Sequence, residues 1–251
     1  MADATLLDVL ALVLLFVLAA VIHGAFGIGF PMITTSVMSI FIGIQNAIAL
    51  TLWPALFVNL LLMFSGIPVW QIIKRYWLVA VMALIGSFVG VYLLFVISQA
   101  VLQLFLSLSI LYYVYTQFRG QSFTLSSNNV FWAIGFGLLA GIVGGATNAM
   151  APILLIYLFS VTQDKNELAQ GANLCFFLGK VAQVVVIYSQ PVAATLDNRL
   201  LIGLMVITIA ALYGGVFIRQ KLPTQLFRKL ILLILLILAI FLLITSLSKL
   251  F

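Results

Sequence analysis

The amino-acid sequence predicts an all-α polytopic membrane protein, built as two inverted repeats of five membrane segments each. Three observations support this fold class: the composition, a glycine-rich stretch that occurs twice, and the placement of the charged residues. Of the 251 residues, 65% are hydrophobic and 6% are charged, with a mean hydropathy of +1.33. Soluble domains carry about 25% charged residues. The apolar runs are long and continuous, whereas barrel strands alternate apolar and polar residues, so the runs indicate membrane helices.

Ten apolar segments follow one another along the chain. A full membrane span requires about 20 residues at a rise of about 1.5 Å each. The segments at 32–42 and 153–160 are too short to cross alone, and each follows a glycine-rich stretch. We therefore expect each repeat to contain a broken, half-length helix, and we expect the two half-length helices to meet near the midplane. Irregular backbone persists at that depth only if it is buried in protein or lines a water-filled cavity. The segments cover residues 6–23, 32–42, 46–66, 76–97, 101–117, 130–142, 153–160, 168–188, 200–218 and 226–247.

The two glycine-rich stretches align with each other. Gly24 and Gly27 of the first match Gly141 and Gly144 of the second at an offset of 117 residues, and this offset continues through the short segments. The connector that follows is four residues longer in the second half, so the offset rises to 121 beyond it. Paired broken segments at corresponding places in two halves are the usual sequence indication of a transporter's central site.

The basic residues lie mostly in the loops between the segments. With the N-terminus outside and five segments in each half, eight of them fall on the inner side and two on the outer side, which satisfies the positive-inside rule. Because five is odd, the second half lies inverted relative to the first, giving a first membrane repeat over 1–120 and a second, inverted repeat over 121–251. The inner residues are Lys74, Arg75, Arg119, Lys165, Arg219, Lys221, Arg228 and Lys229, and the outer ones are Arg199 and Lys249.

Each short segment is expected to begin as a helix near a proline, Pro31 or Pro152. Proline suits the first helical turn because the N–H it lacks would be unpaired there. The remaining first-turn N–H groups, with about half a positive charge from the helix dipole, would point to the membrane centre and bind an anion. Alternatively, the glycines merely let helices pack closely. The candidate substrate-binding residues at the breaks are Gly27, Gly29, Thr34 and Thr35 in the first half, and Gly144, Gly145, Thr147 and Asn148 in the second.

Lys180 is the one formal charge well inside an expected span. Such a charge costs at least ~2.5 kcal/mol, and no carboxylate lies in any span to pair with it, so a bound anion is the expected partner. Alternatively, the side chain extends to the membrane interface, which its place near the middle of 168–188 makes difficult. Asn173 lies two turns earlier on the same helix face, and Gln183 lies one turn later. Asn59 occupies the position opposite Lys180 in the first repeat. We take Asn59, Asn173 and Lys180 as candidate substrate ligands.

His23, the only histidine, lies at the edge of the first break. It is a candidate to bind substrate or to titrate near neutral pH, or else to donate a hydrogen bond to a freed backbone carbonyl. Asn59 and Asn148 are alternatively bridges between helices. One histidine and one cysteine, Cys175, exclude a bis-histidine haem and a dithiol site, and we expect neither a cofactor nor a metal site. The lack of an intramembrane acid argues against an enzyme and against a cation transporter.

At these residues the sequence resembles the sulfite exporter TauE/SafE family of membrane permeases. The resemblance rests on the paired stretches Gly24–Gly29 and Gly141–Gly145 and extends to Pro152–Leu155 and to the alanine-rich helix starts Ala47–Thr51 and Leu168–Asn173. Together with the layout of two similar halves, it covers nearly the whole chain. It implies export of small sulfur oxyanions or organosulfonates across the bacterial inner membrane.

The expected function is therefore a membrane transporter that exports sulfite or an organosulfonate, with the anion held at the midplane by two helix N-termini and Lys180. The alternative is a transporter for a different small anion, with proton coupling through His23. The expected partners are a small anionic substrate and the lipid bilayer. No nucleic-acid partner is expected, because the basic residues occupy short loops between helices. A homodimeric state, the coupling ion and the identity of the anion are left open by the sequence.

Overall fold

A computed structural model describes residues 6–118, 130–189, 198–221 and 223–250. Within these ranges the chain is almost entirely α-helical and contains no strand, which confirms the all-α prediction. Each of the ten expected apolar segments corresponds to one described helix. These helices are α1 (Leu6–Phe26), α2 (Phe30–Ile42), α3 (Ile44–Met63), α4 (Val69–Val96), α5 (Gln99–Phe118), α6 (Val130–Thr147), α7 (Ala151–Val161), α8 (Lys165–Ile187), α9 (Asn198–Lys221) and α10 (Thr224–Leu250).

Seven of the described helices, namely α1, α3, α4, α6, α8, α9 and α10, are long and apolar enough to cross a membrane. In contrast, α2 has 13 residues and α7 has 11. At a rise of about 1.5 Å per residue they are roughly 20 Å and 17 Å long, shorter than the ~30 Å hydrocarbon core. The chain is therefore a multi-pass membrane protein that also contains two short apolar helices.

The break between α1 and α2 covers residues 27–29. Gly27 has φ 75° and Gly29 has φ 116°, a conformation that side chains with a Cβ rarely adopt. These two glycines turn the chain so that α2 begins at Phe30, with Pro31 in its first turn as the sequence predicts. The first glycine-rich stretch therefore forms the break itself.

The break between α6 and α7 covers residues 148–150 and lies beyond the second glycine cluster. The expected end of the segment at residue 142 is wrong, because α6 continues through Gly144 and Gly145 to Thr147. The turn occurs instead at Asn148, whose φ is 63°. Asparagine is one of the few residues with a side chain that visits this left-handed region readily. The second stretch thus differs from the first in where its glycines act.

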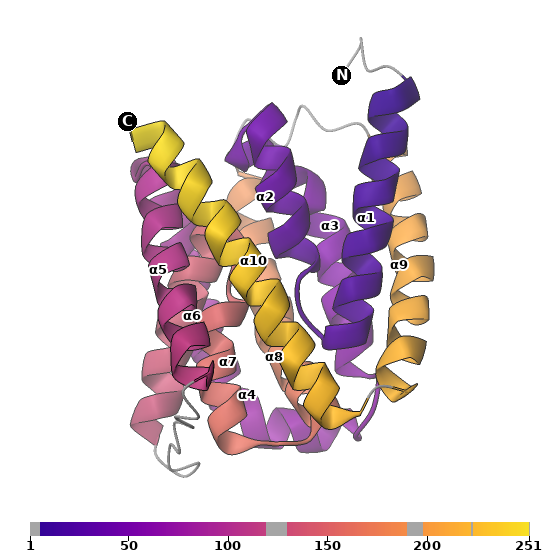
Figure 1. Ribbon diagram of the computed structural model, residues 1–251, viewed down its shortest axis with the longest axis vertical. Helices are drawn as coiled ribbons and strands as arrows, with labels where there is room; N and C mark the ends of the chain where they lie inside the picture. The colour runs from indigo at the N-terminus through magenta and orange to yellow at the C-terminus, as the bar shows by residue number, and fades with distance from the viewer. Residues whose placement is uncertain (1–5, 119–129, 190–197, 222, 251) are drawn as a thin grey trace.

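The glycines of α1 and α9 allow these helices to touch along their backbones. A Cβ at Gly24 would lie 2.2 Å from Leu212 O, and a Cβ at Gly215 would lie 2.2 Å from Val21 O. Neither position has room for any side chain. The two helices therefore run side by side in close contact (Figure 1), as small residues permit in membrane proteins.

The same close approach joins α4 and α6. A Cβ at Gly141 would lie 2.2 Å from Ala83 O, and a Cβ at Gly86 would lie 2.3 Å from Leu138 O. Gly141 and Gly145 of α6 therefore allow close packing on α4, as the alternative interpretation of the sequence held for this stretch.

The connections between helices gather at two ends of the molecule. Figure 1 places the start of α1 and the end of α10 at the upper end and the α3–α4 and α7–α8 connections at the lower end. At the lower end, Arg75 of α4 pairs with Glu167 of α8 at 2.5 Å, and Gln170 Nε2 donates to Met63 O at 2.8 Å. Of the helix ends that lie there, the start of α4 carries Lys74 and Arg75, the start of α8 Lys165, the end of α9 Arg219 and Lys221, and the start of α10 Lys229. The start of α9 carries Arg199 and the end of α10 carries Lys249, and Arg119 lies outside the described residues.

Candidate functional site

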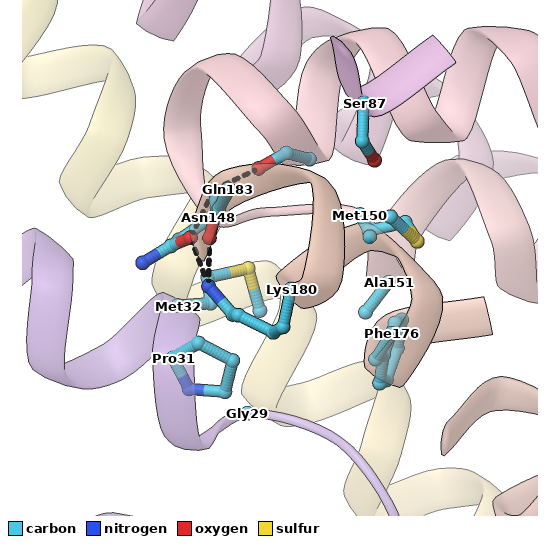
Figure 2. Close-up of a pocket in the computed structure, with 12 residues that line it drawn as sticks. Gly29, Pro31, Met32, Ser87, Asn148, Met150, Ala151, Phe176, Lys180 and Gln183 are labelled. Atoms are coloured by element: carbon cyan, nitrogen blue, oxygen red, sulfur yellow. Dashed lines mark hydrogen bonds between the residues drawn. The ribbon is translucent and has the colours of Figure 1, made fainter. Parts of the chain in front are cut away.

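A small cavity lies where the first turns of α2 and α7 face the middle of α8. Its volume is about 30 Å³, room for on the order of two water molecules or one compact ion. Figure 2 shows Gly29, Pro31 and Met32 on one side of Lys180 and Met150, Ala151 and Phe176 on the other. The lining residues are Gly29, Pro31, Met32, Ser87, Gly144, Asn148, Met150, Ala151, Phe176, Gly179, Lys180 and Gln183.

Helix α8 supplies the charged group of this cavity. The helix starts at an N-cap, Asp164, whose carboxylate accepts hydrogen bonds from the N–H groups of Asn166 and Glu167 at 2.9 and 2.8 Å. From there its helical period brings Lys180 and Gln183, one turn apart, to the same face. That face is buried between the other helices, and only 5% of Lys180 is exposed.

Lys180 has only neutral hydrogen-bond partners in the cavity. Its Nζ donates to Asn148 Oδ1 and, at 2.5 Å, to Gln183 Oε1 (Figure 2). No carboxylate is among the residues that line the cavity. A buried ammonium group normally pairs with an opposite charge, because neutral acceptors only partly replace its hydration. The charged form of Lys180 therefore has no counter-ion among the residues that line the cavity.

Asn148 links the second break to α2 as well as to α8. Its Nδ2 donates to Thr35 Oγ1 at 2.7 Å and to Thr51 Oγ1 at 3.3 Å. Its Oδ1 accepts from Lys180 and, at 2.8 Å, from Gln183 Nε2. All four hydrogen-bonding sites of the amide are thus used within one buried network. This network fixes the left-handed turn that starts the break.

The helix starts on both sides of the cavity supply backbone donors. The first-turn N–H groups of a helix have no intrahelical acceptor. In α2, Phe30 N–H donates to His23 Nδ1 at 3.2 Å, and proline has no N–H, which leaves Met32 N–H available. In α7, Leu154 N–H donates to Met150 O at 3.2 Å, which leaves Ala151 and Ile153 N–H. Two helix N-termini and an ammonium group together form an environment that favours an anion.

His23 lies in a separate polar network. Because its Nδ1 accepts from Phe30 N–H, its Nε2 carries the proton and donates to Asn173 Oδ1 at 2.9 Å. The Nδ2 of Asn173 donates to Gly27 O at 2.8 Å and to Ala169 O at 2.7 Å. These contacts hold the first break against α8. Neither His23 nor Asn173 lines the cavity.

The twelve candidate substrate-binding residues selected from the sequence do not all lie at the cavity. Their roles in binding remain predictions. Four line the cavity: Gly29, Gly144, Asn148 and Lys180. Thr35 and Gly145 are one hydrogen bond away, through Asn148 and Gln183. His23, Gly27 and Asn173 hold the first break. Thr34 and Thr147 donate to carbonyls of their own helices, and Asn59 is buried outside the cavity.

Two polar residues of the network were not selected from the sequence, namely Gln183 and Thr51. Gln183 donates to Gly145 O at 3.1 Å and joins Lys180 to Asn148. Its position one turn from Lys180 on an apolar helix was a usable signal. Thr51 approaches Asn148 from α3, 97 residues away in sequence, and no local pattern indicates that contact.

Comparison with known proteins identifies one family. Residues 12–242, nearly the whole chain, match the family described as sulfite exporter TauE/SafE. No curated protein and no solved structure shows a significant match. The match includes both breaks, all of α8 and the lysine that faces the cavity. On this evidence, the chain belongs to the sulfite exporter TauE/SafE family of membrane transporters.

Proposed function

We propose that this protein exports small sulfur-containing anions, sulfite or an organosulfonate, and that the anion binds between Lys180 and the first turns of α2 and α7. The observation that carries the proposal is the uncompensated charge of Lys180, which is 5% exposed and bonded only to Asn148 and Gln183. Within a membrane such a charge costs at least ~2.5 kcal/mol. An anion in the cavity would neutralise it, and the free N–H groups of the two helix starts would complete the coordination.

The two halves of the chain, residues 1–120 and 121–251, are proposed to be inverted repeats with the site near the midplane. The crossing of α1 on α9 and the crossing of α6 on α4 support this, because they use corresponding residues. Gly24 corresponds to Gly141 and Val21 to Leu138, both at the offset of 117 found in the sequence. Each half also contains one short helix after a break. Such repeats place substrate sites between broken helices.

We further propose that the basic lower end faces the cytoplasm of a bacterial cell, in the inner membrane. The positive-inside rule supports this orientation. An inside-negative potential then favours outward movement of an anion by about 2.3 kcal/mol per charge per 100 mV, or about fifty-fold accumulation outside for a monoanion. The site contains no carboxylate that would take up a cation with the substrate. Export would therefore need no dedicated coupling-ion site.

Flux in proteoliposomes tests this function. Vesicles loaded with labelled sulfite are given a potassium-diffusion potential, with no gradient of protons or sodium. We expect the potential to change the rate of sulfite movement, and vesicles with Lys180→Met protein to lack that flux. If a proton gradient drives the flux and the potential does not, the alternative of proton coupling, with His23 as the proton acceptor, replaces this proposal.

A further inference from the structure

Arg219 is a buried cation outside the Lys180 cavity. The sequence suggested an inner loop position for it, but the structure places it in the last turn of α9 with 0% of the residue exposed. Its Nη2 donates to Ser65 Oγ at 2.6 Å and to Ser65 O at 3.3 Å. Its Nε and Nη1 have no hydrogen-bond partner among the described residues. The three N–H groups on these two nitrogens are thus unsatisfied in a buried position.

A second buried polar group accompanies Arg219. Asn59 of α3 is 0% exposed, and neither its Nδ2 nor its Oδ1 has a partner in the described chain. Asn59 lies close enough to His23 to interact with its side chain, and the charge of Arg219 acts on His23 from within electrostatic range, in the region where α1 and α3 both pack on α9. Two adjacent helices thus present unpaired donors to the same buried region. Buried polar groups without partners are rare in folded proteins and call for a ligand or ordered water.

The charges around Arg219 do not compensate it. Asp164 lies within electrostatic range, but its carboxylate is the N-cap of α8 and forms no ion pair with Arg219 in the described part of the chain. Lys165 Nζ donates to Arg219 O at 2.9 Å, which brings a second cation to the same place. Glu167 is paired with Arg75. Among the described residues, no carboxylate forms an ion pair with Arg219.

A guanidinium group with unsatisfied N–H groups can donate charge-assisted hydrogen bonds to an oxyanion. The Nε–H points to the side of Nη2, whereas Nη1 lies on the other side, beside Cδ, so Nε and Nη1 can each donate a separate hydrogen bond to an anion. We propose that Arg219, together with Asn59, forms a second binding site for a small oxyanion at the basic end of the protein. The inference rests on the proposed function, in that the same transported anion would occupy this site on the cytoplasmic side of the Lys180 cavity.

X-ray diffraction from crystals of the full chain grown with selenite tests the site directly, because selenium scatters anomalously and selenite resembles sulfite. We expect an anomalous peak beside the Arg219 guanidinium in the unmodified protein and in Lys180→Met, and none there in Arg219→Gln. If selenite fills the Lys180 cavity but not the Arg219 region, the inference is wrong and the proposed function stands. A peak at Arg219 alone would support the inference and contradict the central site. If both regions stay empty, both proposals fail.

Flux measurements give a second readout that does not depend on crystals. Arg219→Gln should raise the half-saturation concentration for sulfite applied at the basic end by about ten-fold, because a charged hydrogen bond is lost. Lys221→Gln, an exposed change on the same helix, is the matched control and should leave the value unchanged. Ser65→Ala removes the hydrogen bond but keeps the guanidinium. If Ser65→Ala and Arg219→Gln lower the melting temperature equally and neither alters sulfite saturation, Arg219 only joins α9 to α3 and water satisfies its N–H groups.

Discussion

Replacing Lys180 with methionine is expected to weaken anion binding without weakening the fold. Methionine keeps an unbranched side chain of similar reach but has no charge. A hydrogen bond to a charged group contributes about 1.5–3 kcal/mol. The affinity for sulfite should therefore fall by roughly ten- to 150-fold. Lys180→Arg should also weaken binding, because a cavity of about 30 Å³ has little room for the bulkier planar group.

The stability of the same variant follows from its hydrogen bonds. Gln183 Oε1 loses the donor that lies at 2.5 Å, whereas Asn148 Oδ1 keeps the Gln183 Nε2 donor at 2.8 Å. One unsatisfied acceptor costs about 1–3 kcal/mol. Against this, the variant no longer buries a charge that costs at least ~2.5 kcal/mol. The two effects nearly cancel, so we expect the free energy of unfolding to change by about 1.5 kcal/mol or less.

Purified variants in detergent allow both quantities to be measured, by thermal unfolding and by calorimetric titration with sulfite. Lys74→Met is the matched control, because Lys74 is exposed at the start of α4. It should match the unmodified protein in both measurements. A Lys180→Met protein that melts several degrees lower yet binds sulfite normally would show that the lysine has a structural role, and the reasoning above would fail.

Four further predictions test other parts of the structure. Because Asn148 has φ 63°, Asn148→Gly should keep the turn, whereas Asn148→Ala should strain the backbone there by about 1 kcal/mol more than glycine does. The alanine variant should therefore have the lower melting temperature of the two, and both variants should lose affinity for sulfite. His23→Ala leaves two buried groups unpaired and should cost about 2–6 kcal/mol of stability, about 1–3 kcal/mol for each group. An altered pH profile of flux between pH 6 and 8 would instead implicate the histidine in transport. Gly215→Ala should destabilise the protein, since a Cβ there would lie 2.2 Å from a carbonyl oxygen, whereas Gly214→Ala meets open space and should raise stability by about 0.5–1 kcal/mol. A cysteine introduced at the exposed Trp70 should react with a membrane-impermeant maleimide only in permeabilised cells, and labelling of intact cells would reverse the proposed orientation.

Much of the architecture was accessible from sequence because helices in a membrane are specified locally. Long apolar runs predict spans, and short runs after glycine-rich stretches predict α2 and α7, whose 13 and 11 residues match that expectation. Lys180 was identified in the same way, since a charge inside an apolar run stands out. The glycine pattern was less informative. Gly27 and Gly29 form a break, whereas Gly145 packs α6 on α4, and the same residue type serves both purposes.

The sequence by itself predicted the ten helical segments, two of them short, and one lysine inside an apolar segment, because each depends on neighbouring residues in the chain. Only the tertiary structure decided which polar groups meet. It brought Asn148 and Thr35 together across 113 residues and assigned His23 to the first break instead of the cavity. It also buried Arg219, which the sequence had suggested for a loop. These outcomes depend on how helices cross, and crossings are set by side-chain packing between segments far apart in the chain, which no local pattern encodes.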